Sequence, residues 1–345
     1  QVFGINDIGI HDNFFDLGGH SLKAAQLFYL IERAYGRHLP LSMLFQAPTI
    51  ASLTSLLTQD QRASPWQFLV AMQLRESGLP IFMVPGVDGN VIWFAQLAKF
   101  LGQAHPVYGL QARGVDGKAE PFGSIQEMAT HYVAEIRTCL PQGPYIIVGA
   151  CIGGLVAYEI AQQLVKQGAV VTLIIINSWL PTSYSSYKHR YGFLTGLTVP
   201  LGILSKTMSA FGGFRHMPMK DWWLVVRRKI GTLLSLFRRP PHSDLGRRQR
   251  KRVERAMFQA AANYAVHRYP GHILTFVASQ RIDPQDTRYA WRELADGGCQ
   301  TVEVAARRTG DLVLSPHVEE ISSHIRRYIA EYFLDKPIRP SDKAA

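Results

Sequence analysis

Cysteine is scarce in this chain of 345 residues: only Cys139, Cys151 and Cys299 are present, which gives neither a disulfide framework nor a metal-ligand cluster. No apolar run approaches the roughly 20 residues that a membrane-spanning helix needs, and no internal repeat is visible. The composition, 47% hydrophobic and 18% charged, excludes disordered and fibrous classes. We therefore expect a soluble, cytoplasmic protein without a metal ion or a membrane partner. The absence of an initial Met indicates a segment of a longer polypeptide.

Positive charge is abundant but unevenly distributed. The formal net charge is +11, and residues 183–255 contain sixteen Lys or Arg against three Asp or Glu. The basic excess therefore belongs to one segment and not to a general polyanion-binding surface. A solvated face on an insertion is the favoured interpretation, and we expect no nucleic-acid partner.

The pattern of apolar residues divides the chain into two folded units. Residues 1–58 predict a small helical bundle, and residues 59–66 a polar linker. In residues 67–335, strand and helix patterns alternate, which predicts a mostly parallel sheet with helices on both faces. Residues 183–246 interrupt this alternation and predict a long basic lid, and residues 336–345 a frayed tail. The predicted strands are 67–74, 80–86, 106–112, 145–150, 170–177, 272–279 and 300–306.

A cysteine stands at the sharpest predicted turn of the larger unit. The stretch IIVGACIGGLVAYEIA, residues 146–161, predicts a buried strand, a turn flanked by glycines and an amphipathic helix, with Cys151 at the turn. Strand-turn-helix with G-x-nucleophile-x-G spacing is typical of the nucleophile elbow of α/β-hydrolases, where serine is the usual occupant. Cys151 is therefore a candidate nucleophile.

A serine opens the first helix of the smaller unit. In DNFFDLGGHSLKAAQL, Ser21 follows two glycines, so its hydroxyl either caps the helix or offers a site for a phosphodiester, which the helix dipole favours. The segment DNFFDLGGHSL closely resembles the phosphopantetheine attachment motif of peptidyl carrier domains in nonribosomal peptide synthetases. The resemblance implies a covalent 4'-phosphopantetheine on Ser21, added by a phosphopantetheinyl transferase, and upstream synthetase modules as partners.

A carrier domain followed by an α/β-hydrolase pattern resembles the terminal carrier and type I thioesterase pair of such a synthetase. The segments IFMVPGVDGNVIWFAQLAKFL, LIIINSW, YPGHILTFVA and GDLVLSPHVEEI fall where a thioesterase has its landmarks. By this resemblance the backbone N–H groups of Val87 and Ile152 form the oxyanion hole. Donors fixed there stabilise charge that develops in the tetrahedral intermediate.

The resemblance also implies that all three triad positions are changed. Cys151 replaces the serine, Asn177 stands at the position of the acid, and Thr309 falls where the histidine belongs. His317 is the nearest downstream histidine, and we interpret it as part of the scaffold at a helix start.

Two carboxylates are candidates for a relocated acid, Asp283 and Asp311, and the arginines Arg307 and Arg308 could add positive potential near the nucleophile. A thiol is partly ionised at neutral pH, so it tolerates the loss of a histidine better than serine does.

Transfer of a peptidyl group to Cys151 exchanges one thioester for another, so the group stays activated for cyclisation or for transfer to an amine or alcohol. This resembles thioesterases with cysteine nucleophiles that close strained rings. Two alternatives stay open at this point: a catalytically weak docking or holding module, and a plain hydrolytic thioesterase with a relocated base.

Overall fold

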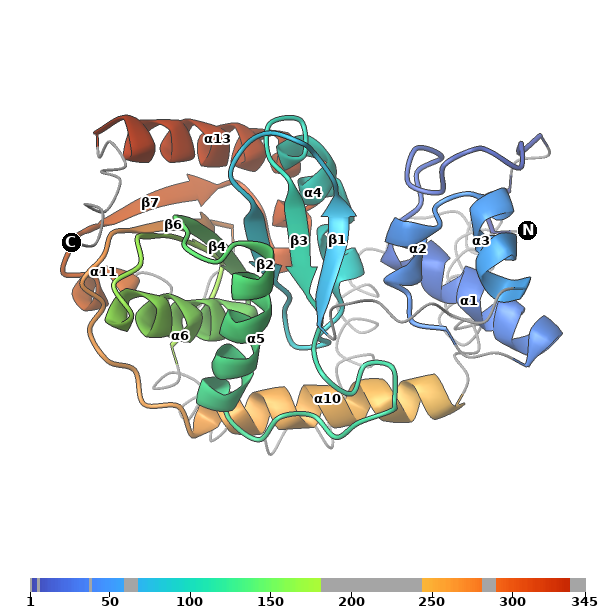
Figure 1. The fold of residues 1–345 in the computed structure, drawn as a ribbon, viewed down its shortest axis with the longest axis horizontal. Helices are drawn as coiled ribbons and strands as arrows, with labels where there is room; N and C mark the ends of the chain where they lie inside the picture. Colours follow the sequence, from blue (N-terminus) through green and yellow to red (C-terminus); the bar gives the residue numbers. More distant parts are fainter. Residues whose placement is uncertain are drawn as a thin grey trace, which may run out of the picture.

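The computed structural model of the chain describes residues 2–4, 7–36, 39–58, 68–180, 244–280 and 290–335. Its larger part is built on a seven-stranded sheet with the strand order β1-β3-β2-β4-β5-β6-β7 (Figure 1). Neighbouring strands are parallel except β1, which pairs antiparallel with β3. The strands are β1 (Leu69–Gln73), β2 (Ile81–Val84), β3 (Val107–Leu110), β4 (Tyr145–Ala150), β5 (Val171–Ile176), β6 (Ile273–Ala278) and β7 (Cys299–Val304).

Every strand predicted from the sequence is present, with each end within two residues of its expected position. The central strands β4 and β5 are buried along their whole length, which explains their continuous apolar sequences, YIIVGA and VTLIII. Strands covered on both faces need no polar alternation, and β-branched residues suit the pleated backbone. The α/β-hydrolase architecture with a mostly parallel sheet is therefore confirmed.

Helices cover both faces of the sheet. The larger apolar cluster joins one face to α5 (Ile125–Cys139), α6 (Gly153–Lys166) and α10 (Asp244–Ala262). The other face packs against α4 (Ala95–Leu101) and α13 (His317–Asp335), so these helices lie opposite α5 and α6 in Figure 1. Short helical turns complete this part: η1 (Val91–Phe94), α11 (Trp291–Leu294) and α12 (Thr309–Leu312).

The N-terminal part is a small helical unit around its own apolar cluster. It contains α1 (Ser21–Tyr35), α2 (Met43–Gln46) and α3 (Ile50–Thr58), and Phe14, Phe28 and Leu44 are buried between them. The three helices confirm the predicted bundle.

The helical unit packs directly against the sheet unit. Ile92, in η1, is 3% exposed because it belongs to the apolar cluster of the small unit. Phe45 of α2 packs in return against the cluster on the α4 face. A hydrogen-bonded ion pair joins Lys99 Nζ in α4 to Asp16 Oδ1, 2.6 Å apart. Apolar and ionic contacts therefore both hold the two units together.

Three of the predicted segments lie partly or wholly outside the described residues. These are the linker, the tail and all of the lid except its last residues, where α10 begins at Asp244. Among the helices that the structure describes, none has the length and apolar character to cross a membrane.

Candidate active site

The turn between β4 and α6 forms a sharp elbow with Cys151 at its tip. Cys151 has φ 52°, in the left-handed region that residues with a Cβ seldom adopt. Its N–H donates to the carbonyl oxygen of Ile176, 3.0 Å away, which ties the elbow to the end of β5. The half-buried Cys151 therefore sits at the carboxyl edge of the sheet, next to the first turn of α6.

Glycines flank the elbow because two backbone segments approach it closely. A Cβ on Gly153 would overlap the Pro85 carbonyl oxygen, and a Cβ on Gly149 would overlap the Gly153 carbonyl oxygen. A Cβ on Gly86 would lie 3.3 Å from the Cβ of Cys151, so the loop after β2 lies against the nucleophile. The G-x-C-x-G spacing is thus a packing requirement of this turn.

The two predicted oxyanion donors belong to these same segments. Val87 directly follows Gly86, and Ile152 follows Cys151 at the N-terminus of α6, where backbone N–H groups point away from the helix. The close approach of Gly86 to Cys151 brings both peptide units near the nucleophile. Their role as an oxyanion hole stays a prediction.

Asn177 and Thr309, 132 positions apart in the sequence, are in direct contact. Asn177 Nδ2 donates to Thr309 Oγ1 at 2.6 Å, and Asn177 Oδ1 accepts from the N–H of Ala278 at 3.0 Å. The Ala278 N–H fixes the orientation of the amide, because only the oxygen can face a donor. Asn177 is 3% exposed and has φ 47°, which asparagine tolerates better than most residues. The structure therefore brings the predicted acid and histidine positions together with neither an acid nor a histidine there.

The remaining predicted residues lie around α12 and α13. Asp311 Oδ2 accepts from the N–H of Arg308 at 3.0 Å, so this carboxylate caps α12. Arg307 and Arg308 are exposed, and His317 is half-buried as the first residue of α13. Asp283 lies outside the described residues. Among the described residues, no group of three His, Cys, Asp or Glu side chains could hold a metal ion.

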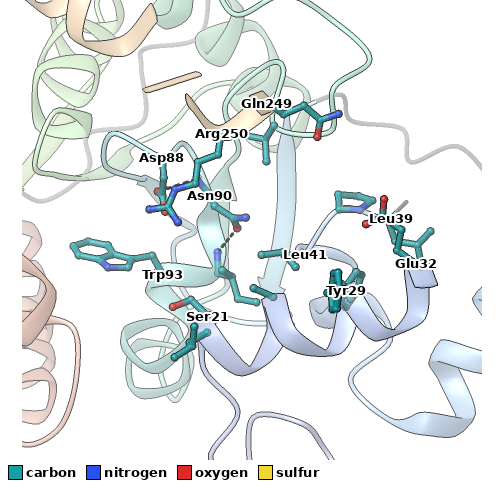
Figure 2. A pocket seen from close by; sticks show the side chains of 16 residues that line it. Ser21, Tyr29, Glu32, Leu39, Leu41, Asp88, Asn90, Trp93, Gln249 and Arg250 are labelled. Carbon is teal, nitrogen blue, oxygen red and sulfur yellow. Dashed lines mark hydrogen bonds between the residues drawn. The ribbon is translucent and has the colours of Figure 1, made fainter. Parts of the chain in front are cut away.

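Ser21 is exposed and is the first residue of α1, and His20 occupies the cap position without a side-chain cap bond. The interpretation of Ser21 as the helix cap is therefore wrong. Gly19 N–H donates to the carbonyl oxygen of Phe14 at 2.9 Å, and this turn presents the serine at the surface of the helix. The hydroxyl opens onto a cavity of about 410 Å³ between the two units, in which Arg250 supplies a positive charge (Figure 2). An exposed hydroxyl, a roomy cavity and a nearby cation fit a phosphopantetheine arm.

Three residues that line this cavity were not predicted from the sequence: Asp88, Trp93 and Arg250. Asp88 directly follows the predicted oxyanion residue Val87 in VPGVDGN, so the sequence already indicated that Asp88 lies near the site. No sequence signal placed Arg250 there, because α10 comes from a distant part of the chain.

Alkylation should distinguish Cys151 from the other two thiols. Burial raises the pKa of Cys139 and of Cys299, so both hold less reactive thiolate at neutral pH. Cys151 lies at the N-terminus of α6, where unpaired backbone N–H groups attract negative charge. With iodoacetamide at pH 7, we expect Cys151 to react about tenfold faster, as measured by peptide mass mapping, and the difference to shrink as the pH rises. Equal rates at pH 7 would contradict activation of Cys151.

Comparisons with known proteins match two parts of the chain. Residues 1–57 match the family model PP-binding, phosphopantetheine attachment site, which indicates a covalently bound 4'-phosphopantetheine, and residues 79–201 match the thioesterase domain model. The dimodular nonribosomal peptide synthase of Bacillus subtilis (strain 168) is 37% identical over 188 residues, covering 54% of this chain and 8% of the relative. Malpibaldin synthetase of Mortierella alpina is 30% identical over 309 residues, covering 88% of this chain and 5% of the relative.

Among solved structures, a holo four-domain nonribosomal peptide synthetase bound to AMP and glycine shares the fold. It has a TM-score of 0.59 and 23% identity, over 98% of this chain and 25% of that one. The chain spans less than a tenth of the length of the two curated relatives named above. It joins a segment that matches the phosphopantetheine attachment site to one that matches the thioesterase domain.

Proposed function

We propose that this chain carries out terminal chain release in nonribosomal peptide synthesis, with Cys151 as the nucleophile. The observation that carries the proposal is the elbow. There Cys151 adopts the left-handed backbone conformation of a tight turn, and the flanking glycines leave room for the backbone packed against it. The packing of the carrier unit against the thioesterase unit, with Ser21 at a shared cavity, supports delivery of the substrate to the same domain.

The prosthetic group, when bound, supplies a flexible arm that ends in a thiol and presents the peptide as a thioester. Cys151 would accept the acyl group from that thioester: its sulfur would form the new C–S bond as the bond to the arm breaks, and the thiol left on the arm would take up a proton. The N–H groups of Val87 and Ile152 would stabilise the oxyanion. An amine or hydroxyl of the peptide, or of an acceptor, then attacks the acyl group on Cys151 and regenerates the thiol.

Asn177 and Thr309 favour this second step over hydrolysis. An amide and a hydroxyl bind no proton at neutral pH, so this pair cannot act as the general base that a serine nucleophile or an attacking water needs. Because Nδ2 of Asn177 donates to Thr309 Oγ1, the threonine hydroxyl keeps its own proton to donate elsewhere. We propose that water is poorly activated here and that ring closure or acyl transfer prevails.

Intact-protein mass spectrometry tests the proposal. After the carrier is loaded with an acyl-phosphopantetheine, we expect an acyl adduct on Cys151, located by peptide mapping, and product release. In Cys151→Ala the adduct and release should disappear, with a loss of at least about a thousandfold. Cys299→Ala is the matched control, because Cys299 begins the edge strand β7.

Turnover that survives Cys151→Ala would overturn the assignment of the nucleophile. A rate limb between about pH 6 and 7 in wild-type turnover would instead support a hydrolase with a relocated histidine base. We propose upstream synthetase modules and a phosphopantetheinyl transferase as partners and a peptidyl thioester as the substrate.

A further inference from the structure

The cavity between the two units has walls from three separate parts of the chain. Figure 2 shows Ser21 and Tyr29 of α1 on one side and Asp88, Asn90 and Trp93 from the segment between β2 and α4 on another, with the end of Arg250 of α10 next to Asp88. A site that combines these segments exists only when the carrier unit is docked.

Arg250 is the one cationic side chain among the described residues that line the cavity. Its Nε donates to Glu254 Oε1 at 2.9 Å, one turn along the same helix, and this bond leaves the terminal nitrogens of the fork for other acceptors. A planar guanidinium fork matches the oxygens of a phosphate better than an ammonium group does. Arg250 is therefore suited to bind a phosphodiester that is attached to the Ser21 oxygen.

Asp88 lies beside the Arg250 guanidinium (Figure 2). Burial raises the pKa of Asp88, and the positive charge of Arg250 opposes that effect. The carboxylate also accepts from the N–H of Asn90 at 3.3 Å, which holds the loop in place. A phosphodiester on Ser21 would compete with this carboxylate for the guanidinium.

The loop that carries Asp88 also links the cavity to the nucleophile. Gly86 lies against Cys151, and Asp88, two residues further, lines the cavity at Ser21. The loop after β2 therefore joins the cavity at Ser21 to the elbow at Cys151.

We propose that Arg250 is a positioning residue that pairs with the phosphodiester on Ser21 and so aligns the arm for entry past the loop after β2. The proposal rests on the proposed function, because it takes Ser21 as the attachment site. It assigns α10, at the end of the basic segment, a role in receiving the carrier-bound substrate.

Phosphorus NMR of the holo chain tests this inference without any catalysis. In a Cys151→Ala background, we expect the phosphodiester resonance of the docked arm to be broadened and shifted from that of the same holo chain unfolded in urea. Arg250→Gln should narrow the signal and move it toward the position seen in the unfolded chain. Arg255→Gln, an exposed arginine on the same helix that does not line the cavity, should leave it unchanged.

A kinetic comparison on the chain with Cys151 intact completes the test. Arg250→Gln should slow transfer from the carrier about tenfold more than transfer from an N-acetylcysteamine thioester, which lacks the phosphate. Two results would overturn the role of Arg250 without affecting the proposed function. One is a phosphorus signal of the loaded chain that is the same with and without Arg250. The other is an equal loss of transfer rate for both substrates. Absence of the added phosphopantetheine mass on Ser21 would overturn the attachment as well.

Discussion

Gly153→Ala is expected to abolish acylation of Cys151 and to lower the free energy of unfolding by about 3 kcal/mol. The new Cβ would overlap the Pro85 carbonyl oxygen and crowd that of Val84, and both belong to the backbone at the end of β2. Backbone atoms of a central strand cannot turn aside as a flexible side chain can. The elbow would therefore move away from the loop that carries Val87. Urea unfolding and the mass of the acyl adduct measure the two effects.

Gly123→Ala is the matched control for this change. The nearest atom to a Cβ at Gly123 is Glu127 Oε2 at 3.9 Å, which is an ordinary contact, and no left-handed φ is required there. We expect an effect on stability within about 0.5 kcal/mol and normal acylation. Full acylation in Gly153→Ala would show that the close packing of the elbow on β2 is not needed for the chemistry.

Installing the missing base should convert the site into a hydrolase. In the triple variant Cys151→Ser, Asn177→Asp and Thr309→His, the new histidine would stand beside the new carboxylate, because positions 177 and 309 are already in contact. The carboxylate introduced by Asn177→Asp could keep the bond from the Ala278 N–H that the Asn177 amide oxygen accepts. General base catalysis typically contributes about 10²–10⁴-fold. We expect the free acid as the main product, measured by liquid chromatography with mass detection.

Cys151→Ser alone is the control for the triple variant. Its serine has no base, so acyl transfer should nearly cease. Hydrolysis gained in the triple variant and not in Cys151→Ser would show that a base at positions 177 and 309 decides between hydrolysis and acyl transfer. A triple variant as inactive as the single one would favour the docking or holding module, in which the fold binds a carrier without chemistry of its own.

The sheet was predictable because its central strands are continuous apolar runs, and the elbow was predictable because glycines flank its turn. The contact between Asn177 and Thr309 was not predictable from spacing, because it depends on where the ends of β5 and β6 meet α12. Resemblance located the two positions, whereas the geometry shows that they still form a hydrogen-bonded pair.

The cavity was also beyond prediction from the sequence. It brings Ser21, Asp88 and Arg250 together from three distant segments, and it depends on how one unit docks on the other. The antiparallel edge strand β1 likewise became clear only from its pairing with β3. Local sequence patterns predict helices and strands, whereas the way in which the two units dock is set by side chains that pack across their interface.

The burial of Ile92 in the apolar cluster of the small unit also affects how readily this unit undocks from the sheet unit. Undocking would return this side chain to water, at a cost of roughly 2 kcal/mol, and the surface ion pair of Lys99 with Asp16 adds at most about 1 kcal/mol. Because the two units belong to one chain, docking is unimolecular and needs no high affinity. Contacts of this size would keep the helical unit docked for most of the time and would still allow it to undock readily.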